Sequence, residues 1–526
     1  MDGAPTAIPA NAPGWWRDRV FYEVFVRSFA DSDGDGIGDL RGLIGRLDYL
    51  NDGNPATRDD LGVTGIWLMP VAEAASYHGY DVTDYRAVEH DYGTAADMRM
   101  LVAAAHERGM AVIVDMVPNH TSDQHPWFRD ALTRGSAHDD WYVWSDTNPG
   151  YGGPNGELVW HPAAGRFYYG LFWAGMPDLN LRNPAVTAEL HDVARFWLSD
   201  VGVDGFRLDA VIHFIESGRE QVNTPETHAW LRDFHAAVRA AKPGAMLLGE
   251  AWDVARTTAS YVPEDVDLVF EFGLAAATVN AVKRESARPM VTAQKETLEL
   301  YESGGYATFL TNHDQNRVAS QLSGDRDRLR LAAELLLTGT GVPFVYYGEE
   351  LGLTGAKPDE RIRTPMAWSA VDPAAGFTTG VPWEPLEDGW PTRNVATLSA
   401  DAGSLLASYR ELIRLREAHA ALRVGDALTV TSTADPVAAT LRTSAGETLL
   451  VIANLSSAAV TDYALSLDAG PLCGRPGAAV VFAGGSDTGA TAAPAQPTVT
   501  PAGGFSEYSP LGTLPPRSVT VISLKP

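Results

Sequence analysis

The feature that most constrains the fold is a regular alternation of short apolar runs with amphipathic helical stretches. Eight runs rich in β-branched and aromatic residues have the length and composition of buried strands, at 20–27, 63–71, 111–117, 205–211, 245–252, 267–273, 306–312 and 342–348. Helical stretches fall between them, at 95–108, 184–201, 225–241, 326–338 and 402–418. Eight strands that alternate with helices predict a (β/α)₈ TIM barrel. A doubly wound open sheet is the alternative.

Two regions depart from this alternation. Residues 117–176 follow the third predicted strand, lack clear periodicity and are rich in Gly, Pro, Trp and Tyr, as an inserted domain or functional loop would be. After about residue 422, short alternating segments separated by turns predict an antiparallel β-sandwich. We therefore divide the chain into a catalytic barrel (1–116 and 177–421), a small inserted domain (117–176) and a C-terminal β-sandwich domain (422–526).

The charge balance narrows the class of ligand. The 526 residues carry 40 Lys and Arg against 67 Asp and Glu, which gives a net charge of −27 at pH 7. So acidic a chain repels polyanions, which excludes nucleic acids and anionic membranes as partners and favours neutral or cationic ligands. The single cysteine excludes an intramolecular disulfide and a thiolate zinc cluster. No apolar stretch reaches roughly 18 residues, so we expect no membrane span.

The sequence is compatible with more than one cellular compartment. The N-terminus has neither the basic n-region nor the apolar h-region of a signal peptide. It fits a cytoplasmic start, or an extracellular protein whose signal has been removed, which is the alternative that we favour. We expect the protein to act as a monomer.

Three carboxylates, Asp209, Glu250 and Asp314, follow three predicted strands, at the end of a (β/α)₈ barrel where active sites form. Alternation turns Arg207 and Asp209 toward the barrel interior, where the Arg207 charge should keep Asp209 ionised, as a nucleophile requires. The apolar run before Glu250 should raise its pKa, as a general acid requires. A structural ion pair is the alternative for Arg207 and Asp209 alone, but three such carboxylates together favour catalysis.

This set of carboxylates favours retaining glycoside hydrolysis, in which a nucleophile and an acid/base lie about 5 Å apart and a covalent glycosyl-enzyme forms. The third carboxylate could hold sugar hydroxyls or stabilise the oxocarbenium ion. His120 and His313 also fall at strand ends and could donate hydrogen bonds to the sugar, although a lone histidine is more often simply packed. Tyr80 and the tryptophans of the inserted segment could stack on sugar rings, with core packing as the alternative.

Short motifs resemble a known family. DMVPNH (115–120), GFRLDAV (205–211), LGEAW (248–252) and FLTNHD (309–314) match, in order and spacing, four conserved regions of the α-amylase superfamily of glycoside hydrolases. MPDLN (176–180) resembles a fifth. The similarity covers about residues 15–420, and the rest resembles the C-terminal sandwich of that family.

The resemblance assigns roles to particular residues. It implies that Asp209 is the nucleophile, Glu250 the general acid/base and Asp314 the transition-state stabiliser. It also implies that a further set of residues contacts the sugar at the cleavage site, namely His78, Tyr80, Asp81, His120, Arg207 and His313.

The segment 31–39 predicts a calcium site, because aspartates at alternate positions repel one another unless they share a cation. A solvated turn is the alternative, and Gly42 in place of a twelfth-position Glu argues against a true EF-hand. The loop resembles the Ca²⁺ loop after the first strand in many oligo-α-glucosidases of the superfamily. That resemblance implies the ligands Asp31, Asp33, Asp35, Asp39 and the Ile37 carbonyl.

A second metal site is implied only by resemblance to amylases that hold calcium between the barrel and the inserted domain. The matching positions are Asn119, Asp178 and His213. The chain departs from that pattern at Ile212, where a Lys is common.

Weaker signs bear on the subtype. MPDLN is intermediate between the QPDLN of oligo-1,6-glucosidases and the MPKLN of neopullulanases, and Ala210 resembles the α-1,4-specific pattern. Asp81, with an arginine such as Arg393, could hold a terminal glucose and favour exo action. We predict a calcium-dependent, retaining, α-amylase-like hydrolase of α-1,4-glucans, acting on starch, maltodextrin or malto-oligosaccharides. The alternatives are an exo-acting α-glucosidase, a transglycosylase such as a trehalose synthase, or a non-catalytic sugar-binding relative.

Overall fold

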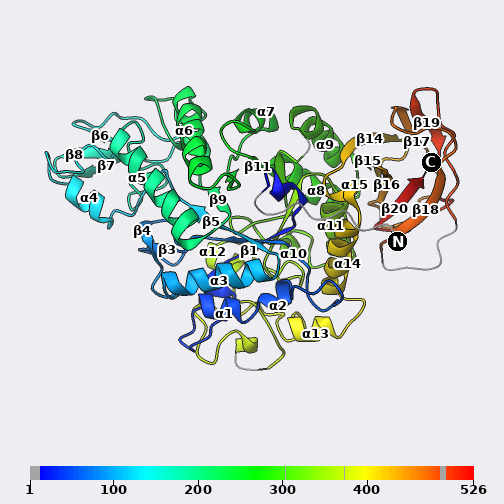
Figure 1. Ribbon diagram of the computed structural model, residues 1–526, viewed down its shortest axis with the longest axis horizontal. Coiled ribbons are helices and arrows are strands. Elements are labelled where there is room, and N and C mark those ends of the chain that lie inside the picture. Colours follow the sequence, from blue (N-terminus) through cyan, green and yellow to red (C-terminus); the bar gives the residue numbers. More distant parts are fainter. Residues whose placement is uncertain (1–11, 303, 372–373, 486–492, 526) are drawn as a thin grey trace.

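The computed structural model describes residues 12–302, 304–371, 374–485 and 493–525 (Figure 1). Most of the N-terminal stretch that we searched for a signal peptide therefore lies outside the described residues. None of the described helices is long and apolar enough to cross a membrane.

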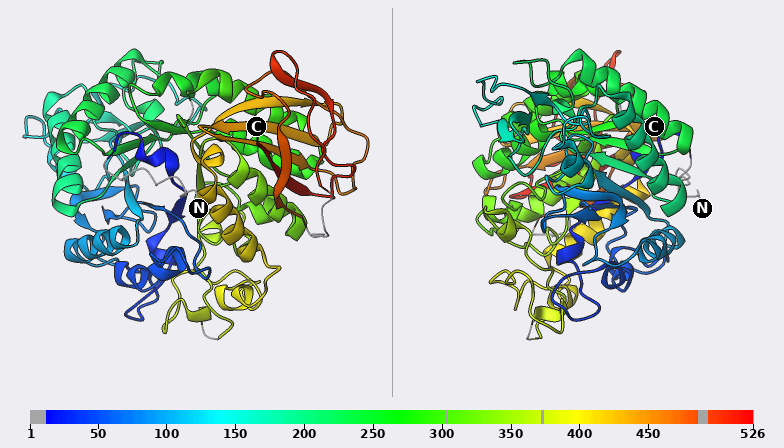
Figure 2. Two further views of the ribbon diagram at one scale, coloured as in Figure 1. Left: turned by 45° about the vertical axis from the view of Figure 1, so that its right-hand side comes forward. Right: turned by 90° about the vertical axis from the view of Figure 1, so that its left-hand side faces the viewer.

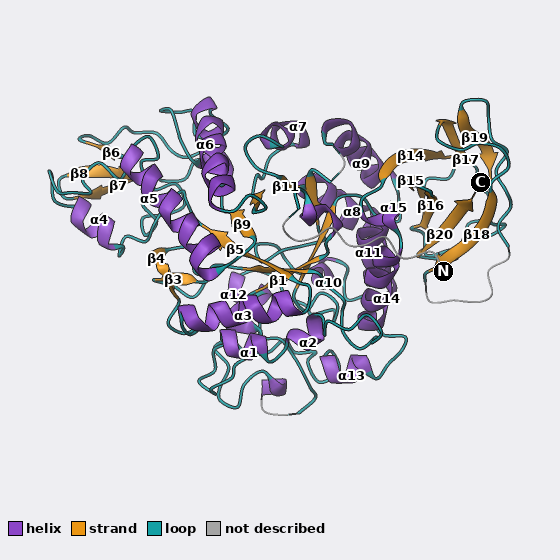
Figure 3. Cartoon of the chain, viewed as in Figure 1, coloured by secondary structure: helices purple, strands orange, loops and turns teal. Residues whose placement is uncertain are grey.

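A closed barrel of eight parallel strands forms the centre of the molecule, in the order β1-β13-β12-β11-β10-β9-β5-β2 (Figure 3). The strands are β1 (Phe21–Val24), β2 (Gly65–Leu68), β5 (Ala111–Met116), β9 (Gly205–Leu208), β10 (Met246–Gly249), β11 (Leu268–Phe270), β12 (Tyr306–Thr308) and β13 (Val342–Tyr346). Each lies within one of the eight predicted runs, so the barrel is confirmed and the open sheet is excluded. Asp209 and Glu250 directly follow the last residues of their strands.

Alternation along the strands separates two apolar cores. Inward residues such as Trp67, Phe270 and Phe344 fill the barrel. Outward residues such as Phe206 and Leu208 belong to a larger core that the surrounding helices share. The expected orientation of Arg207, opposite in direction to Phe206 and Leu208, is therefore confirmed, and its guanidinium lies 5.5 Å from the Trp67 ring centre.

The main helices surround the barrel, and capping residues mark where several of them begin (Figure 1). Thr94 and Asp97 form a capping box at the start of α3, and Thr224 caps α6 directly before a proline. The helices are α1 (Leu40–Ile44), α2 (Leu47–Leu50), α3 (Ala95–Glu107), α4 (Pro126–Ala131), α5 (Pro184–Arg195), α6 (Pro225–Ala241), α7 (Ala255–Thr258), α8 (Phe272–Arg284), α9 (Arg288–Leu300), α10 (Val318–Gln321), α11 (Arg326–Thr338), α12 (Asp359–Ile362), α13 (Val395–Ser399), α14 (Leu405–Ala418) and α15 (Ala420–Arg423).

Two small antiparallel sheets extend from the barrel. The segment after β5 contains a three-stranded sheet of β6 (Trp144–Ser145), β8 (Arg166–Tyr169) and β7 (Trp160–Ala163). The sequence did not predict the other sheet, a hairpin of β3 (Ala72–Ala74) and β4 (Val82–Val88) between β2 and α3. Figures 1 and 2 place the three-stranded sheet and the C-terminal domain on opposite sides of the barrel.

The C-terminal domain is a seven-stranded antiparallel sheet in the order β18-β20-β16-β15-β14-β17-β19. Its strands are β14 (Asp426–Ser432), β15 (Val437–Ser444), β16 (Glu447–Asn454), β17 (Leu465–Ala469), β18 (Gly477–Ala483), β19 (Gly503–Tyr508) and β20 (Ser518–Lys525). Leu441, Leu450 and Phe505 belong to one apolar core of its own. The sequence predicted a sandwich for this domain. In the structure β14 pairs with both β15 and β17, so it joins the strands on its two sides into one continuous sheet.

Candidate active site

One buried guanidinium connects three carboxyl groups at the end of the barrel. Arg207 lies in β9, Asp115 lies in the neighbouring strand β5, and Glu250 directly follows the other neighbour, β10. The guanidinium makes three ion pairs, with Asp115 Oδ1 at 2.8 Å, Asp209 Oδ1 at 2.7 Å and Glu250 Oε2 at 2.8 Å. A single positive charge cannot neutralise three carboxylates, so this cluster favours retention of a proton.

The two carboxyl groups expected to react have raised pKa values. Burial raises the pKa of Glu250 to about 7 against the influence of the Arg207 charge, which agrees with the expected general acid. Burial also raises the pKa of Asp209 above its ordinary value. Arg207 supports ionisation of Asp209 as expected, but desolvation is the larger influence, and the sequence expectation left it out.

Asp314 lies after β12 and has different partners. Its Oδ1 is 3.0 Å from Arg363 Nη2 and its Oδ2 is 3.2 Å from His313 Nε2. Burial favours the neutral acid, but the contacts with His313 and Arg363 outweigh it and lower the pKa of Asp314. Neighbouring carboxyl groups with pKa values shifted in opposite directions are suited to different roles in one reaction.

A cavity of about 320 Å³ brings these three carboxyl groups together. Its lining residues are His78, Tyr80, His120, Phe172, Trp173, Met176, Asp209, Glu250, Asp314, Asp359 and Arg363. Phe172 and Trp173 are 45% and 53% exposed, so the cavity has an aromatic face open to solvent, as sugar stacking needs. The sequence indicated tryptophans of the inserted segment here, but it did not single out Phe172.

Three of the predicted sugar contacts, Arg207, His313 and Asp81, do not line the cavity. Arg207 and His313 are fully buried, and neither lines it. Asp81 is also buried, and its carboxylate accepts hydrogen bonds from the backbone N–H and the hydroxyl of Ser76, at 3.1 and 2.7 Å. It lies 4.0 Å from the Nδ1 of His78 and so supports a residue that does line the cavity.

The arginine at the cavity is not the one that we suggested. Arg393 pairs with Glu387, whereas Arg363 contacts Asp314 and lines the cavity together with Asp359. Both lining residues lie in α12 or directly after it, a segment without strand or motif signal, so no pattern in the sequence could have indicated them.

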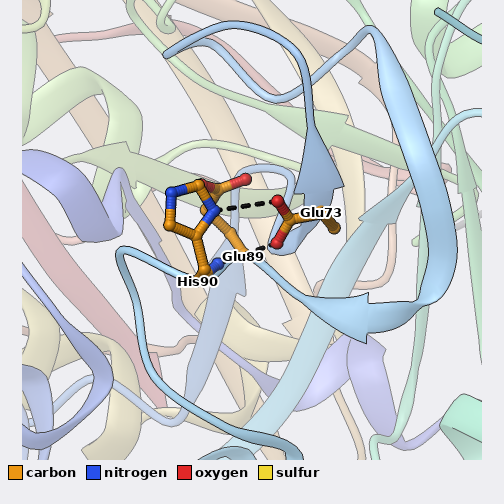
Figure 4. Close-up of side chains that lie close together, drawn as sticks. All are labelled: Glu73, Glu89 and His90. Atoms are coloured by element: carbon orange, nitrogen blue, oxygen red, sulfur yellow. Dashed lines mark hydrogen bonds and ion pairs between the residues drawn. The ribbon is translucent and has the colours of Figure 1, made fainter. Parts of the chain in front are cut away.

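The β3-β4 hairpin carries His78 and Tyr80 in its turn, and a charged cluster closes its base (Figure 4). The Nδ1 of His90 lies 2.8 Å from Glu73 Oε1 and 3.1 Å from Glu89 Oε1. These are the separations of hydrogen-bonded ion pairs. The cluster joins the two strands that bring His78 and Tyr80 to the cavity.

The predicted calcium loop brings three of its four aspartates together. Carboxylate oxygens of Asp31, Asp33 and Asp39 lie within 4.8 Å of one another. Asp35 is not part of this cluster, and its carboxylate accepts the N–H of Ile37 at 2.8 Å. Gly36 has a φ of 96°, and a Cβ there would lie 1.9 Å from a backbone oxygen, so the loop requires glycine at this position.

Two of the three residues predicted for the second metal site, Asn119 and Asp178, contact each other. Asn119 donates a hydrogen bond to Asp178 Oδ2 at 3.0 Å, whereas the Nδ1 of His213 lies 3.2 Å from the carbonyl of Gln221. Burial raises the pKa of Asp178 well above its ordinary value, which favours a neutral acid.

Comparisons with known proteins agree with the motifs. A family model described as the catalytic domain of alpha amylase matches residues 23–425. Alpha-amylase 3 of Dictyoglomus thermophilum is 38% identical over 413 residues, covering 77% of this chain and 78% of the relative. Trehalose synthase/amylase of Mycobacterium tuberculosis is 35% identical over 515 residues, covering 86% and 84%. The crystal structure of an alpha-amylase from H. orenii aligns with a TM-score of 0.84 at 38% identity, covering 97% and 100%.

Proposed function

Because the chain belongs to the α-amylase family of glycoside hydrolases and transglycosylases, we propose that it hydrolyses α-1,4-glucosidic bonds of starch, maltodextrin or malto-oligosaccharides with retention. The observation that carries this proposal is the guanidinium of Arg207, which contacts both Asp209 and Glu250. Two carboxyl groups on one guanidinium lie side by side, which suits the separation of about 5 Å in a retaining pair.

The proposed reaction uses the differences between the carboxyl groups. Glu250, with a pKa of about 7, gives its proton to the glycosidic oxygen as the bond to the anomeric carbon breaks. The Asp209 carboxylate attacks that carbon and forms a covalent glycosyl-enzyme. The ionised Glu250 then takes a proton from water, which attacks the same carbon and releases Asp209. Asp314, whose lowered pKa keeps it ionised, stabilises the positive charge that develops on the sugar ring.

An exo-acting α-glucosidase or a trehalose synthase is the second candidate, because a sugar hydroxyl can replace water in the second step. One observation favours it: a cavity of about 320 Å³ is at the lower end of ligand pockets, which suits short sugars better than long chains.

Product time courses from soluble starch, a blocked maltoheptaoside and maltose separate these candidates. Cleavage of the blocked substrate supports endo hydrolysis, whereas glucose released only from free chain ends, or trehalose formed from maltose, supports the second candidate. Asp209→Asn should lower the rate by roughly 10⁴-fold or more while the protein stays folded. Asp204→Asn is a matched control, because this buried Asp pairs with His106 and Lys242 away from the cavity. Full activity of Asp209→Asn would contradict the mechanism.

We also propose that Asp31, Asp33 and Asp39 hold a Ca²⁺ ion, with the Ile37 carbonyl as a further oxygen ligand. Support comes from the donor set, because these clustered carboxylates make no ion pair with Arg, Lys or His in the described part of the chain, and such a cluster favours a hard divalent ion. The ion would neutralise the loop and stabilise its packing against the segment 377–383, to which Asp31 N is already bonded through Phe377 O at 2.9 Å. We do not extend this proposal to the second predicted set, because Asn119 donates to Asp178 Oδ2 and the Nδ1 of His213 contacts the carbonyl of Gln221.

A further inference from the structure

Glu23, in the middle of β1, contacts the site from inside the barrel, and neither the motifs nor the cavity lining includes it. We propose that Glu23 is a positioning residue whose protonated carboxyl group donates a hydrogen bond to Nδ1 of His313 and so keeps the proton of this imidazole on Nε2, facing Tyr80 and Asp314. The kinetic consequence of this inference rests on the proposed function, whereas the tautomer itself does not.

The contacts form an unbroken chain of short distances. Glu23 Oε1 lies 2.6 Å from Nδ1 of His313, and Nε2 of the same ring lies 2.6 Å from the hydroxyl oxygen of Tyr80. That hydroxyl is 3.0 Å from Asp115 Oδ2. Glu23 and His313 are 2% and 0% exposed, so bulk solvent does not reach either side chain.

The direction of the chain depends on which end holds the extra proton. A neutral imidazole and a phenol each have one proton to donate, so the whole chain must run one way. It runs toward Asp115 if Glu23 is protonated, and toward Glu23 if Asp115 is protonated. Burial raises the pKa of Asp115 to about 8, but its contact with the Arg207 guanidinium at 2.8 Å opposes burial and favours the ionised form, a contact that Glu23 lacks. Glu23 makes no ion pair with Arg or Lys among the described residues, so the proton resides on Glu23.

The surrounding charges support this direction. Burial raises the pKa of Glu23 well above its ordinary value, and the charges of Asp314 and Asp115 act in the same direction, with Arg207 opposing them. Burial lowers the pKa of His313 to about 3, with Arg363, Arg207 and Lys357 adding to the effect and Asp314 opposing it. The imidazole is therefore neutral at pH 7, and only one of its nitrogens carries a proton.

This tautomer serves the carboxylate that lines the cavity. The Nε2–H of His313 lies 3.2 Å from Asp314 Oδ2 as well as close to Tyr80. With the proton on Nδ1 instead, a bare nitrogen lone pair would face an ionised carboxylate in a buried site, which is repulsive. Glu23 thus acts through His313 on Asp314 and Tyr80, both of which line the cavity.

The test is a direct measurement of the tautomer. The protein with ¹⁵N-labelled histidine is examined by NMR at pH 7, and the His313 signals are assigned by their loss in His313→Gln. We expect wild-type His313 to be protonated on Nε2. In Glu23→Gln the amide N–H can still donate to Nδ1, so the tautomer should persist. Glu23→Leu removes the donor, so Nδ1 loses its hydrogen bond and its ¹⁵N signal should move to that of an unbonded nitrogen, while the proton stays on Nε2 beside Asp314.

Kinetics provide the second readout. If the proposed hydrolysis occurs, Glu23→Leu should lower kcat by roughly 10- to 100-fold with a smaller change in KM, and Glu23→Gln should recover most of the loss. Protonation of wild-type His313 on Nδ1, or an Nδ1 signal in folded Glu23→Leu that is unchanged from wild type, would overturn the inference. If Glu23→Leu does not fold, the wild-type and Glu23→Gln spectra still decide. The expected tautomer in a protein that cleaves no α-glucan would reject the proposed function alone.

Discussion

Buried arginines at the candidate active site and at the C-terminal end of α11 have opposite surroundings. Arg207 contacts three carboxyl groups, whose charges outweigh its burial and raise its pKa well above the ordinary value. Arg416 and Arg442 pair with no carboxylate within the described part of the chain, and they donate instead to backbone carbonyls. Burial lowers the pKa of Arg416 to about 9 and that of Arg442 to about 10.

The carbonyls that these two arginines bind include Leu337, Thr338 and Gly339, at the C-terminal end of α11. The partial negative charge of a helix C-terminus suits a cation and does not titrate. Arg207 instead has an excess of titratable partners, which leaves a proton available for chemistry. The difference shows that a buried arginine stabilises the fold when neutral dipoles satisfy it, and shapes reactivity when several acids compete for it.

The largest expected effect separates the two kinds of arginine. Arg207→Met should lower kcat on malto-oligosaccharides by roughly 10³-fold or more, because Asp209 and Glu250 lose the charge that holds them. Arg442→Met should lower the free energy of unfolding by about 3–5 kcal/mol, because it leaves several buried carbonyls without donors, but should change kcat in the folded protein only a few fold. Rates at low temperature and thermal unfolding of both variants would check this. Similar effects of the two variants on both quantities would remove the distinction.

The raised pKa of Glu250, which contacts Arg207, should be visible in the pH dependence of kcat/KM. Glu250 has a pKa raised to about 7 and must be protonated to act as the acid, so kcat/KM should fall as the pH rises through about 7. An aryl α-glycoside with a good leaving group needs little acid catalysis, so its glycosylation step should keep more of its rate in Glu250→Gln than that of maltotriose does. An unchanged rate on the alkaline side would mean that Glu250 is not the acid.

The carboxylates of the loop 31–39 form a third group for comparison. Unlike the acids around Arg207, those of Asp31, Asp33 and Asp39 make no ion pair with an arginine among the described residues. If Ca²⁺ binds them instead, excess chelator should lower Tm by several degrees, and added Ca²⁺ should restore it, because an ion bound only to the folded state stabilises it. Asp33→Asn should weaken this response. The same Tm with and without chelator would argue against an exchangeable ion.

The smallest expected effect concerns His90, the exposed residue of the cluster at the base of the hairpin. Its contact with Glu73 raises the pKa of His90, so the stabilisation is complete below the ordinary histidine pKa and is lost as the pH rises through the raised value. The His90 side chain is 73% exposed, and solvent screening limits its contribution to less than about 1 kcal/mol. His90→Gln should therefore shift Tm slightly at pH 5.5 and not at pH 8.5. A large loss of activity would show that the cluster controls His78 and Tyr80 directly.

Much of the barrel could be predicted because its signals are local. Each strand lies within an apolar run, and period-two alternation correctly turned Arg207 away from Phe206. The β3-β4 hairpin was missed because β3 has only three residues and β4 is partly polar, so no apolar run marks either strand. Arg363 was missed for a different reason: it reaches Asp314 from an irregular segment, and only the closed barrel brings the two together.

The sequence by itself determined the strand periodicity, the carboxylates at the strand ends and the excess of acids, because these depend on residue type and spacing along the chain. Only the tertiary structure decided which acids share Arg207, which imidazole Glu23 contacts and which arginine faces the cavity. Those properties depend on burial and on distances of about 3 Å between residues far apart in the sequence. Desolvation and Coulomb forces act through space, so they take their values only when the barrel closes.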